Sequence, residues 1–207
     1  MLHLYYTRVG ELKEDLPISD YRKQKLFTVH NEQLRQQMLT AELLLNRAVK
    51  NIYPQIAFPL HIEATKSGKP YFPDLPLFFS LSHSGDYVAC AIADFEIGLD
   101  IQGIRPVSMP LARRFFSETE LRQLQASEHP NELFTLLWSL RESYWKATGR
   151  GIAGSLNVAV YENETGFGIS GLPDIRFWTK TQVAFVLALC SLNGQEPWPD
   201  RIESNVY

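Results

Sequence analysis

The acidic residues Asp100 and Glu142, together with Lys146, are the side chains in this sequence best suited to chemistry. Asp100 follows an apolar run in "IGLDIQ", and Glu142 and Lys146 lie one helical turn apart in "LWSLRESYWKATG". Carboxylate oxygens are the ligands that Mg²⁺ prefers, and the ion commonly shares them with water and substrate phosphates. These residue types therefore favour a site that binds a metal ion and an anionic ligand.

The same three residues also have purely structural interpretations. Asp100 can cap the turn after its strand, and Glu142 with Lys146 can form a surface ion pair that stabilises a helix by about 0.2–0.5 kcal/mol. Large aromatic residues in the same segment indicate instead that much of this helix is covered: Trp138, Tyr144 and Trp145. A covered Glu and Lys are costly unless a metal and an anion occupy the site. Gln102 shares the strand face of Asp100 and offers an amide oxygen as a weaker, neutral ligand.

Ser82 and His83 lie between two apolar runs, in "FSLSHSG". A lone histidine is more often structural than functional, but an imidazole beside hydroxyl groups and loop amides is well suited to a phosphate. Two basic residues of "YRKQK", Arg22 and Lys25, form either a solvated face or part of a phosphate clamp. Each of these signals is weak alone.

The segment "KSGKP" reads as a turn that could also border a flat ligand. Gly68 would allow the backbone to approach such a ligand closely, and Pro70 would fix the direction of the chain. Lys69 lies between them. The residues alone leave both interpretations open.

The sequence contains no recognisable nucleophile. It lacks the motifs G-x-S-x-G and H-E-x-x-H, a Walker loop and a cluster of cysteine ligands. It offers carboxylates, cations and hydrogen-bond donors instead. That set fits phosphoryl-type transfer, in which positioning and charge neutralisation provide most of the catalysis.

Composition limits the classes of protein that this chain can belong to. The 207 residues are 45% hydrophobic and 21% charged, with a formal net charge of −3, which argues against a generally basic nucleic-acid binder. Cys90 and Cys190 lie in apolar runs, so we expect buried free thiols and a reducing compartment. We see no signal peptide and no apolar run of the roughly 18 residues that a membrane span needs. We therefore expect a cytoplasmic protein without membrane contact.

Hydrophobic periodicity predicts alternating helices and strands. Helices are expected over residues 31–50 and over "NELFTLLWSLRESYWKATG", with Asn131 as the N-cap and Gly149 as the stop. Ser117 and Glu120 form a capping-box signature for a further helix. The predicted strands are "AFPLHIEAT", "LFFSLSHS", "DYVACAIAD" and "EIGLDIQ" in the first half and "LNVAVYE", "IRFWTKT" and "VAFVLALCS" in the second.

One long helix followed by a small antiparallel meander, twice, predicts an α+β fold of two similar halves. We expect these to be residues 1–104 and 105–207, divided at the proline-containing segment "IRPVSMP". Tight turns at Gly85–Asp86 and Asp94–Phe95 should join adjacent strands of the first half. The polar tail "NGQEPWPDRIESNVY" is expected to wrap the surface or to be loose. Ligand sites often form in the cleft between such halves, so we expect the site there.

Taken in order, these segments resemble the 4'-phosphopantetheinyl transferases of the surfactin-synthetase-activating (Sfp) type. The similar blocks are "SGKPYFPDLP", "FSLSHSG", "IGLDIQ", "RRFFSETE" and "LWSLRESYWKATGRGI". The likeness runs from about Tyr21 to Ile152, with a weaker continuation through the last strands. One block would be weak evidence, whereas five in the correct order and spacing are strong evidence.

The resemblance implies transfer of the phosphopantetheine arm of coenzyme A to a serine of an apo carrier protein, with release of adenosine 3',5'-bisphosphate. It also implies the family's pseudo-twofold pair of α+β halves, with the coenzyme in the cleft between them. By block matching, Asp100 and Glu142 bind Mg²⁺ with the pyrophosphate, and Lys146 neutralises the pyrophosphate. The serine proton would pass to Glu142 or to a water on the metal. The residues implied for the nucleotide end are Ser82, His83, Lys25 and Arg22 for the 3'-phosphate and Gly68, Lys69 and Pro70 for the adenine.

Gln102 is a departure from the family pattern, because many relatives carry a carboxylate at this position. Without that charge, Asp100 and Glu142 are the anionic ligands of the metal. Either the amide oxygen of Gln102 or a water then completes the coordination shell. Lower metal affinity is the expected consequence.

Two other classes of function are alternatives to the transferase. A non-catalytic binder of coenzyme A or carrier protein would bind the coenzyme without releasing the bisphosphate. A Mg²⁺-dependent nuclease is disfavoured by the mildly acidic net charge and the lack of an extended basic groove. We expect a monomer whose partners are coenzyme A and an apo acyl or peptidyl carrier protein, without nucleic acid. Phe115 and Phe116 could either receive a carrier helix or pack in the core.

Overall fold

The chain folds into two compact units, each described here by itself. The computed structural model describes residues 1–207 except 13–14, 152–158, 164–165 and 205–207. The first unit is made of Met1–Glu96 and Pro199–Tyr207, and the second of Ile97–Trp198. The mixed α+β class is as predicted. The expected division after residue 104 differs from these units because the strand that starts at Ile97 pairs within the second unit.

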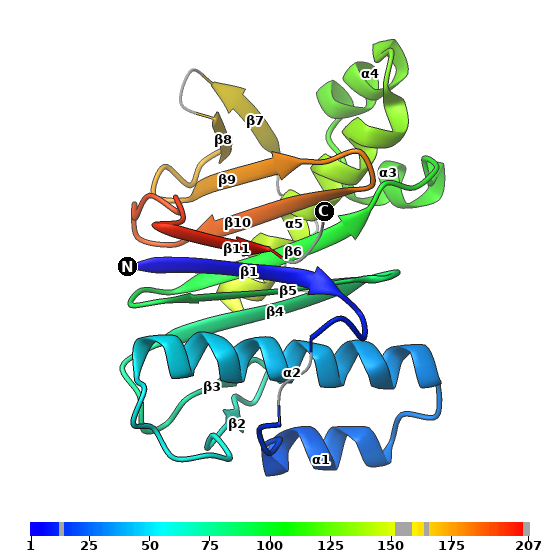
Figure 1. Ribbon diagram of the computed structural model, residues 1–207. Helices are drawn as coiled ribbons and strands as arrows, with labels where there is room; N and C mark the ends of the chain where they lie inside the picture. Colours follow the sequence, from blue (N-terminus) through cyan, green and yellow to red (C-terminus); the bar gives the residue numbers. More distant parts are fainter. Residues whose placement is uncertain (13–14, 152–158, 164–165, 205–207) are drawn as a thin grey trace. The chain divides into compact units, whose positions relative to one another are not determined.

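In the first unit, four strands form a sheet in the order β11-β1-β5-β4. Its elements are β1 Leu2–Arg8, α1 Asp20–Phe27, α2 Glu32–Ile52, the short pair β2 Glu63–Ala64 and β3 Pro70–Tyr71, β4 Phe78–Ser84, β5 Tyr87–Ala93 and β11 Arg201–Ser204. β5 is antiparallel to both β1 and β4, whereas β11 is parallel to β1. Figure 1 shows α2 running along this sheet, where it contacts β5 and β4.

Helix α2 begins at its predicted cap and buries one apolar face. Asn31 Oδ1 accepts the backbone N–H of Leu34 at 2.9 Å. The buried side chains recur at helical spacing and meet those of β5: Ala41, Leu44, Leu45, Ala48 and Val49 against Val88, Cys90 and Ile92. Each fully buried Leu, Ile or Val contributes about 1.5–3 kcal/mol. Cys90 and Cys190 are both buried free thiols, as predicted.

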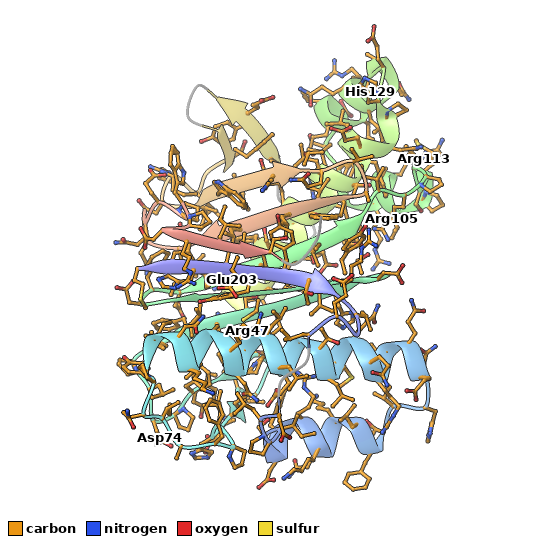
Figure 2. The ribbon with its side chains drawn as sticks, in the orientation of Figure 1. Arg47, Asp74, Arg105, Arg113, His129 and Glu203 are labelled. Atoms are coloured by element: carbon orange, nitrogen blue, oxygen red, sulfur yellow. The ribbon has the colours of Figure 1, made fainter. Side chains whose placement is uncertain are left out.

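The C-terminal segment pairs with the N-terminal strand instead of lying loose. β11 runs parallel to β1 with Ile202 opposite Leu4, and the backbone N–H of Leu2 donates to Asp200 Oδ2 at 2.7 Å. Arg47 Nη1 of α2 lies 3.5 Å from Glu203 Oε1; both side chains are labelled in Figure 2. A polar tail becomes a strand here because β1 would otherwise leave a row of backbone groups unpaired at the sheet edge.

In the second unit, three strands form an antiparallel sheet in the order β6-β10-β9. Its elements are β6 Ile97–Gly103, α3 Met109–Phe115, α4 Glu118–Ala126, α5 Pro130–Thr148, the pair β7 Val160–Asn163 and β8 Gly166–Ile169, β9 Arg176–Thr181 and β10 Phe185–Ser191. Helix α5 packs on β6 and β10. In the view of Figure 1 it lies behind this sheet.

Helix α5 approaches β6 closely because β6 has no side chain at Gly98. A Cβ placed there would lie 2.0 Å from the backbone oxygen of Ser143 and 2.3 Å from the backbone nitrogen of Ala147. Successive side chains of a strand point to opposite faces, so Gly98, Asp100 and Gln102 share the face towards α5. The close contact therefore brings the acidic residue of β6 next to the helix.

Arg141 and Glu120 form a fully buried ion pair that attaches α4 to α5. Arg141 Nη2 lies 2.7 Å from both carboxylate oxygens of Glu120, and its other groups donate to the backbone oxygens of Phe115 and Leu137 at 3.0 Å. Glu120 also closes the predicted capping box, accepting the N–H of Ser117 at 2.6 Å. Removing one partner of such a pair typically costs about 3–5 kcal/mol, because the other charge stays buried.

Two predictions about strands of the first half are wrong. The turn at Gly85–Asp86 joins β4 to β5 as expected, but β6 does not pair with β5. The chain at Asp94–Phe95 leaves the first sheet, and β6 pairs with β10 instead. Of the strand predicted over residues 57–65, only Glu63–Ala64 forms. Pro59 disfavours strand pairing there because proline has no backbone donor.

The long helices α2 and α5 form where they were predicted, but the N-cap of α5 is His129 and not Asn131. α5 begins at Pro130, and Asn131 Oδ1 instead accepts the N–H of Val107 at 3.1 Å. Gly149 ends the helix with a left-handed backbone, φ +67°, as expected. The part of the predicted strand "LNVAVYE" before residue 159 lies outside the described residues. Within the described ranges, no helix combines the length and apolar character needed to cross a bilayer.

Gly98→Ala is expected to destabilise the second unit by about 1–3 kcal/mol, because the new methyl group would overlap backbone atoms of α5. Denaturant unfolding measures this loss. Ala147→Gly, which costs about 1 kcal/mol in a helix, is the control. Since the overlap is with backbone, adding Ala147→Gly to Gly98→Ala should not restore stability. A double variant as stable as Ala147→Gly alone would contradict the close contact.

Candidate functional site

Asp100 and Lys146 form the ion pair at the centre of the predicted site. Asp100 lies on β6 with 1% of its surface exposed, and Lys146 Nζ on α5 lies 2.7 Å from its Oδ1. Lys146 keeps 30% of its side-chain surface exposed. The ammonium group therefore lies at the boundary between core and surface, where a ligand could also reach it.

Glu142 lies one turn before Lys146 on the same helix. Burial raises the pKa of Glu142 above its ordinary value, and the negative charge of Asp100 raises it further. The charges of Lys146 and Arg105 act in the opposite direction and lower this pKa. Two repelling carboxylates flanked by cations are typical of a site that binds a divalent ion or an anion.

Asp100, Glu142 and Gln102 supply oxygen donors of the kind that fits Mg²⁺. Gln102 is half-buried and faces the same side of β6 as Asp100. Mg²⁺ typically takes one or two protein carboxylates and completes its shell with water and substrate phosphates. Across the described part of the chain, no three His, Cys, Asp or Glu side chains gather into a metal site. The donor set therefore suits an ion that shares its coordination with a substrate.

Ser82 and His83 both lie on β4, which points their side chains in opposite directions. Ser82 is buried and His83 is half-buried. Phe79 and Leu81 alternate with Ser82 and belong to the core beside α2, so His83 shares that side of the strand. A ligand on one face of β4 can contact only one of these two side chains.

The predicted turn "KSGKP" lies between β2 and β3. Gly68 has a φ of +89° and donates its N–H to the backbone oxygen of Thr65 at 2.9 Å. The positive φ is a structural reason for glycine. Nothing lies within 4 Å of the position that a Cβ would take, so a flat ligand also has room there. Lys69 and Pro70 follow and are half-buried.

Arg22 and Lys25 both belong to α1, but they differ in accessibility. Arg22 is 8% exposed, and its Nε lies 3.3 Å from Glu42 Oε2. Lys25 is exposed, with its Nζ 5.6 Å from the ring centre of Tyr21. Arg22 therefore has a structural partner, and Lys25 is the better placed of the two for a phosphate.

Phe115 and Phe116 belong to the core of the second unit. They are 5% and 7% exposed. Phe115 packs edge-on against Trp138 and Trp145, each with ring centres 5.6 Å away. Of the two interpretations of these phenylalanines, core packing is the one that the structure supports.

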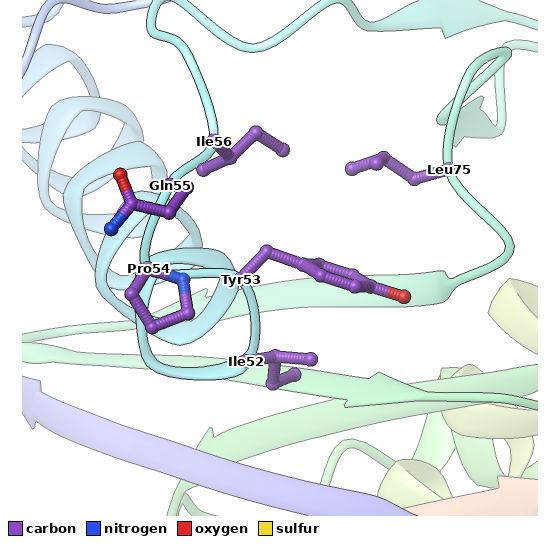
Figure 3. A pocket seen from close by; sticks show the side chains of 6 residues that line it. All are labelled: Ile52, Tyr53, Pro54, Gln55, Ile56 and Leu75. Atoms are coloured by element: carbon purple, nitrogen blue, oxygen red, sulfur yellow. The ribbon is translucent and has the colours of Figure 1, made fainter.

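An apolar pocket of about 420 Å³ in the first unit contains none of the predicted residues. Residues 52–56 at the end of α2 line it together with Leu75, as Figure 3 shows. The polar groups of this lining are those of Tyr53 and Gln55 and the backbone. The lining therefore offers no charged side chain to a metal ion or a phosphate.

Arg105, two residues after β6, was not among the predicted site residues. Its guanidinium carbon lies 5.4 Å from the ring centre of Trp138 and 5.5 Å from that of Phe134. Its backbone N–H donates to Thr135 Oγ1 at 3.3 Å. These partners all belong to α5, the helix that carries Glu142. In the sequence it is a single cation before a proline, "GIRP", a pattern too common to indicate a site.

Comparisons with known proteins agree on one family. Residues 96–190 match the model of the 4'-phosphopantetheinyl transferase superfamily. A 4'-phosphopantetheinyl transferase of Bacillus subtilis is 32% identical over 201 residues, 92% of this chain and 88% of the relative. The transferase psf-1 of Bacillus pumilus is 36% identical over 140 residues, 66% of this chain and 60% of the relative. The transferase Sfp of Bacillus subtilis strain 168 is 32% identical over 139 residues, 66% and 62% of the two chains.

The matched range contains Asp100, Gln102, Glu142 and Lys146, the predicted site residues of the second unit. An α+β protein with this match is an enzyme of the transferase class. More particularly, the chain belongs to the 4'-phosphopantetheinyl transferase family, because one relative aligns with it over nearly its whole length. The resemblance inferred from the sequence blocks is thereby confirmed.

Glu142→Gln is expected to stabilise the protein at neutral and alkaline pH, measured as the melting temperature in the presence of a chelator. The pKa of Glu142 is raised above 4.5 on folding, so its contribution to stability is greatest below that value and is lost as pH rises through the raised pKa. Glutamine does not ionise, so the advantage of the variant should grow as pH rises from 4.5 through the raised pKa of Glu142 and should then level off.

The control is Glu118→Gln, which removes an exposed glutamate of the same unit. It reports the effect of deleting one acidic charge from the surface. A difference in melting temperature between Glu142→Gln and wild type that does not change between pH 4.5 and neutral pH would contradict the raised pKa.

Proposed function

We propose that this enzyme transfers the 4'-phosphopantetheine group of coenzyme A to a serine of an apo carrier protein, with Mg²⁺ as cofactor. One observation carries the proposal: Lys146 lies 2.7 Å from Asp100, with Glu142 one turn away, in a chain of this family. The sequence contains no motif of a covalent nucleophile, and a partner that supplies the attacking hydroxyl group fits a site made of carboxylates and cations.

We assign the pyrophosphate end of the coenzyme to residues of the second unit. Asp100 and Glu142 would hold Mg²⁺, and Gln102 would contribute its amide oxygen or face a water of the ion. When bound, Mg²⁺ supplies positive charge that offsets the charge developing on the leaving bisphosphate. Lys146 would bind a pyrophosphate oxygen, since its partly exposed side chain could turn from Asp100 to the substrate.

We assign the nucleotide end of the coenzyme to residues of the first unit. Exposed Lys25 is the favoured ligand of the 3'-phosphate, and His83 or Ser82 would contribute from β4. Arg22 would act more weakly, because Glu42 already holds its Nε. The residues proposed for the adenine are Gly68, Lys69 and Pro70. One chain supplies all of these groups, so we keep the expectation of a monomer.

We also propose that the two units are related copies of one α+β fold. Each packs a long helix, α2 or α5, against a sheet. Each places a buried cysteine on an interior strand, Cys90 on β5 and Cys190 on β10. These shared features support a repeated architecture. The residues proposed to bind the coenzyme differ between the two units.

The proposed reaction forms one bond to phosphorus and breaks another. The serine oxygen of the carrier attacks the phosphorus that bears pantetheine, and the bond from that phosphorus to the bridging oxygen breaks. Adenosine 3',5'-bisphosphate leaves with the bridging oxygen. Our candidates for the base that accepts the serine proton are Glu142 and a water bound to the metal. Lys146 donates to a phosphoryl oxygen and stabilises the leaving group.

Incubation with coenzyme A, Mg²⁺ and an apo carrier domain is expected to add the mass of phosphopantetheine to the carrier, as measured by intact mass spectrometry. Asp100→Ala and Glu142→Ala should each lower the rate roughly 100-fold or more, because each removes a ligand of the metal. Glu118→Ala, at an exposed position, is the control.

Several carriers should be tried, from fatty acid, polyketide and peptide synthesis. No mass increase on any of them would contradict the transferase proposal. Tight coenzyme binding without release of the bisphosphate would indicate a non-catalytic binder. Near-normal activity of either alanine variant would show that the metal assignment is wrong.

Gln102→Glu is expected to lower the Mg²⁺ concentration needed for half-maximal activity by roughly tenfold, because a carboxylate is a stronger ligand than an amide. Calorimetric titration with Mg²⁺ provides a readout that does not require turnover. Gln123→Glu makes the same exchange at an exposed position of α4 and is the control. Unchanged metal dependence would place Gln102 outside the coordination shell.

A further inference from the structure

The guanidinium group of Arg105 is held by aromatic rings. It lies 5.4 Å from the ring centre of Trp138 and 5.5 Å from that of Phe134. Its Nε and Nη2 atoms are buried and make no hydrogen bond to the described part of the chain. Buried donors without a partner are unfavourable, so a movement of the Arg105 side chain that brings these donors to the oxygens of an anion would be favourable.

Arg105 extends a row of charges along α5. Trp138, Glu142 and Lys146 follow one another at intervals of about one helical turn. The guanidinium over Trp138 is close enough to Glu142 to lower the pKa of that carboxyl group. Glu142 thus lies between two cations, Arg105 on one side and Lys146 on the other. Figure 2 labels Arg105 in the second unit, just beyond the end of β6.

The charges of this group balance. Asp100 and Glu142 offset Lys146 and Arg105, and Gln102 adds none. Mg²⁺ carries two positive charges, and the pyrophosphate of coenzyme A carries two negative charges, one on each phosphoryl group. The group therefore stays neutral when ion and pyrophosphate bind together.

We propose that Arg105 binds a pyrophosphate oxygen of coenzyme A, as a second cation beside Lys146. This proposal rests on the proposed function. Stacking on Trp138 and Phe134 orients the planar guanidinium, and its fork of N–H donors matches phosphoryl oxygens. Arg105 then contributes to binding of the ground state and to stabilisation of the departing bisphosphate.

The test measures coenzyme affinity by calorimetry with Mg²⁺ and without a carrier protein. Arg105→Gln should weaken the binding of coenzyme A roughly 10- to 100-fold, the usual loss for a hydrogen bond to a charged group. The substitution should weaken the binding of 3'-dephospho-coenzyme A by the same factor, because both ligands contain the pyrophosphate. Arg105→Lys keeps the charge and should recover part of the affinity. Arg113→Gln makes the same exchange at an exposed position of α3 and should leave affinity unchanged.

Three results would overturn the proposal. If Arg105→Gln weakened the binding of coenzyme A but not that of 3'-dephospho-coenzyme A, Arg105 would contact the 3'-phosphate. Unchanged coenzyme affinity with a raised KM for the carrier would make it a contact of the carrier protein. A lowered melting temperature with unchanged affinity would make it a structural residue only. If the wild type binds coenzyme A but transfers nothing, the proposed function fails, whereas the calorimetric result for Arg105 still stands.

Discussion

Helix α5 lies directly against β6 because the strand has no side chain at Gly98, and the proposed site depends on that contact. The backbone of Ser143 and Ala147 occupies the space that any larger residue would need. Two residues further along the same strand face, Asp100 then lies within 2.7 Å of Lys146. The absence of a side chain at Gly98 thus allows Asp100 of β6 and Lys146 of α5 to form an ion pair.

The charged residues of α5 differ in burial: Arg141 is buried, whereas Glu142 and Lys146 are partly exposed. Arg141 points into the core, where Glu120 and two backbone oxygens use its donors, and both members of this pair are 1% exposed. Such a pair fixes the position of the helix, because the charged groups have hydrogen-bond partners and removing one member would leave the other charge buried and unpaired. Glu142 and Lys146 lie at the partly exposed edge of the same helix. In the proposed function, their partial exposure leaves them accessible to a ligand.

The electrostatics around Glu142 make its ionised form unfavourable when nothing is bound. Burial and Asp100 raise the pKa of Glu142, which means that the ionised carboxylate is less stable there than in water. Lys146 and Arg105 offset part of this cost. A divalent cation would offset more of it, and in the proposed function that cation arrives with a substrate phosphate. Instability of the free site and affinity for the ligand then have the same physical origin.

The sequence by itself determined the long helices, several of the strands and the family. Helical periodicity, the capping box at Ser117 and the stop at Gly149 depend on residues within a few positions, so α2, α4 and α5 were predictable. Motif blocks indicated Asp100, Glu142 and Lys146 as candidate site residues. Only the tertiary structure decided that Lys146 contacts Asp100, that β6 joins β10, that β11 pairs with β1 and that Arg105 stacks on α5. Such contacts join residues far apart in the chain, and they follow from packing that no local pattern encodes.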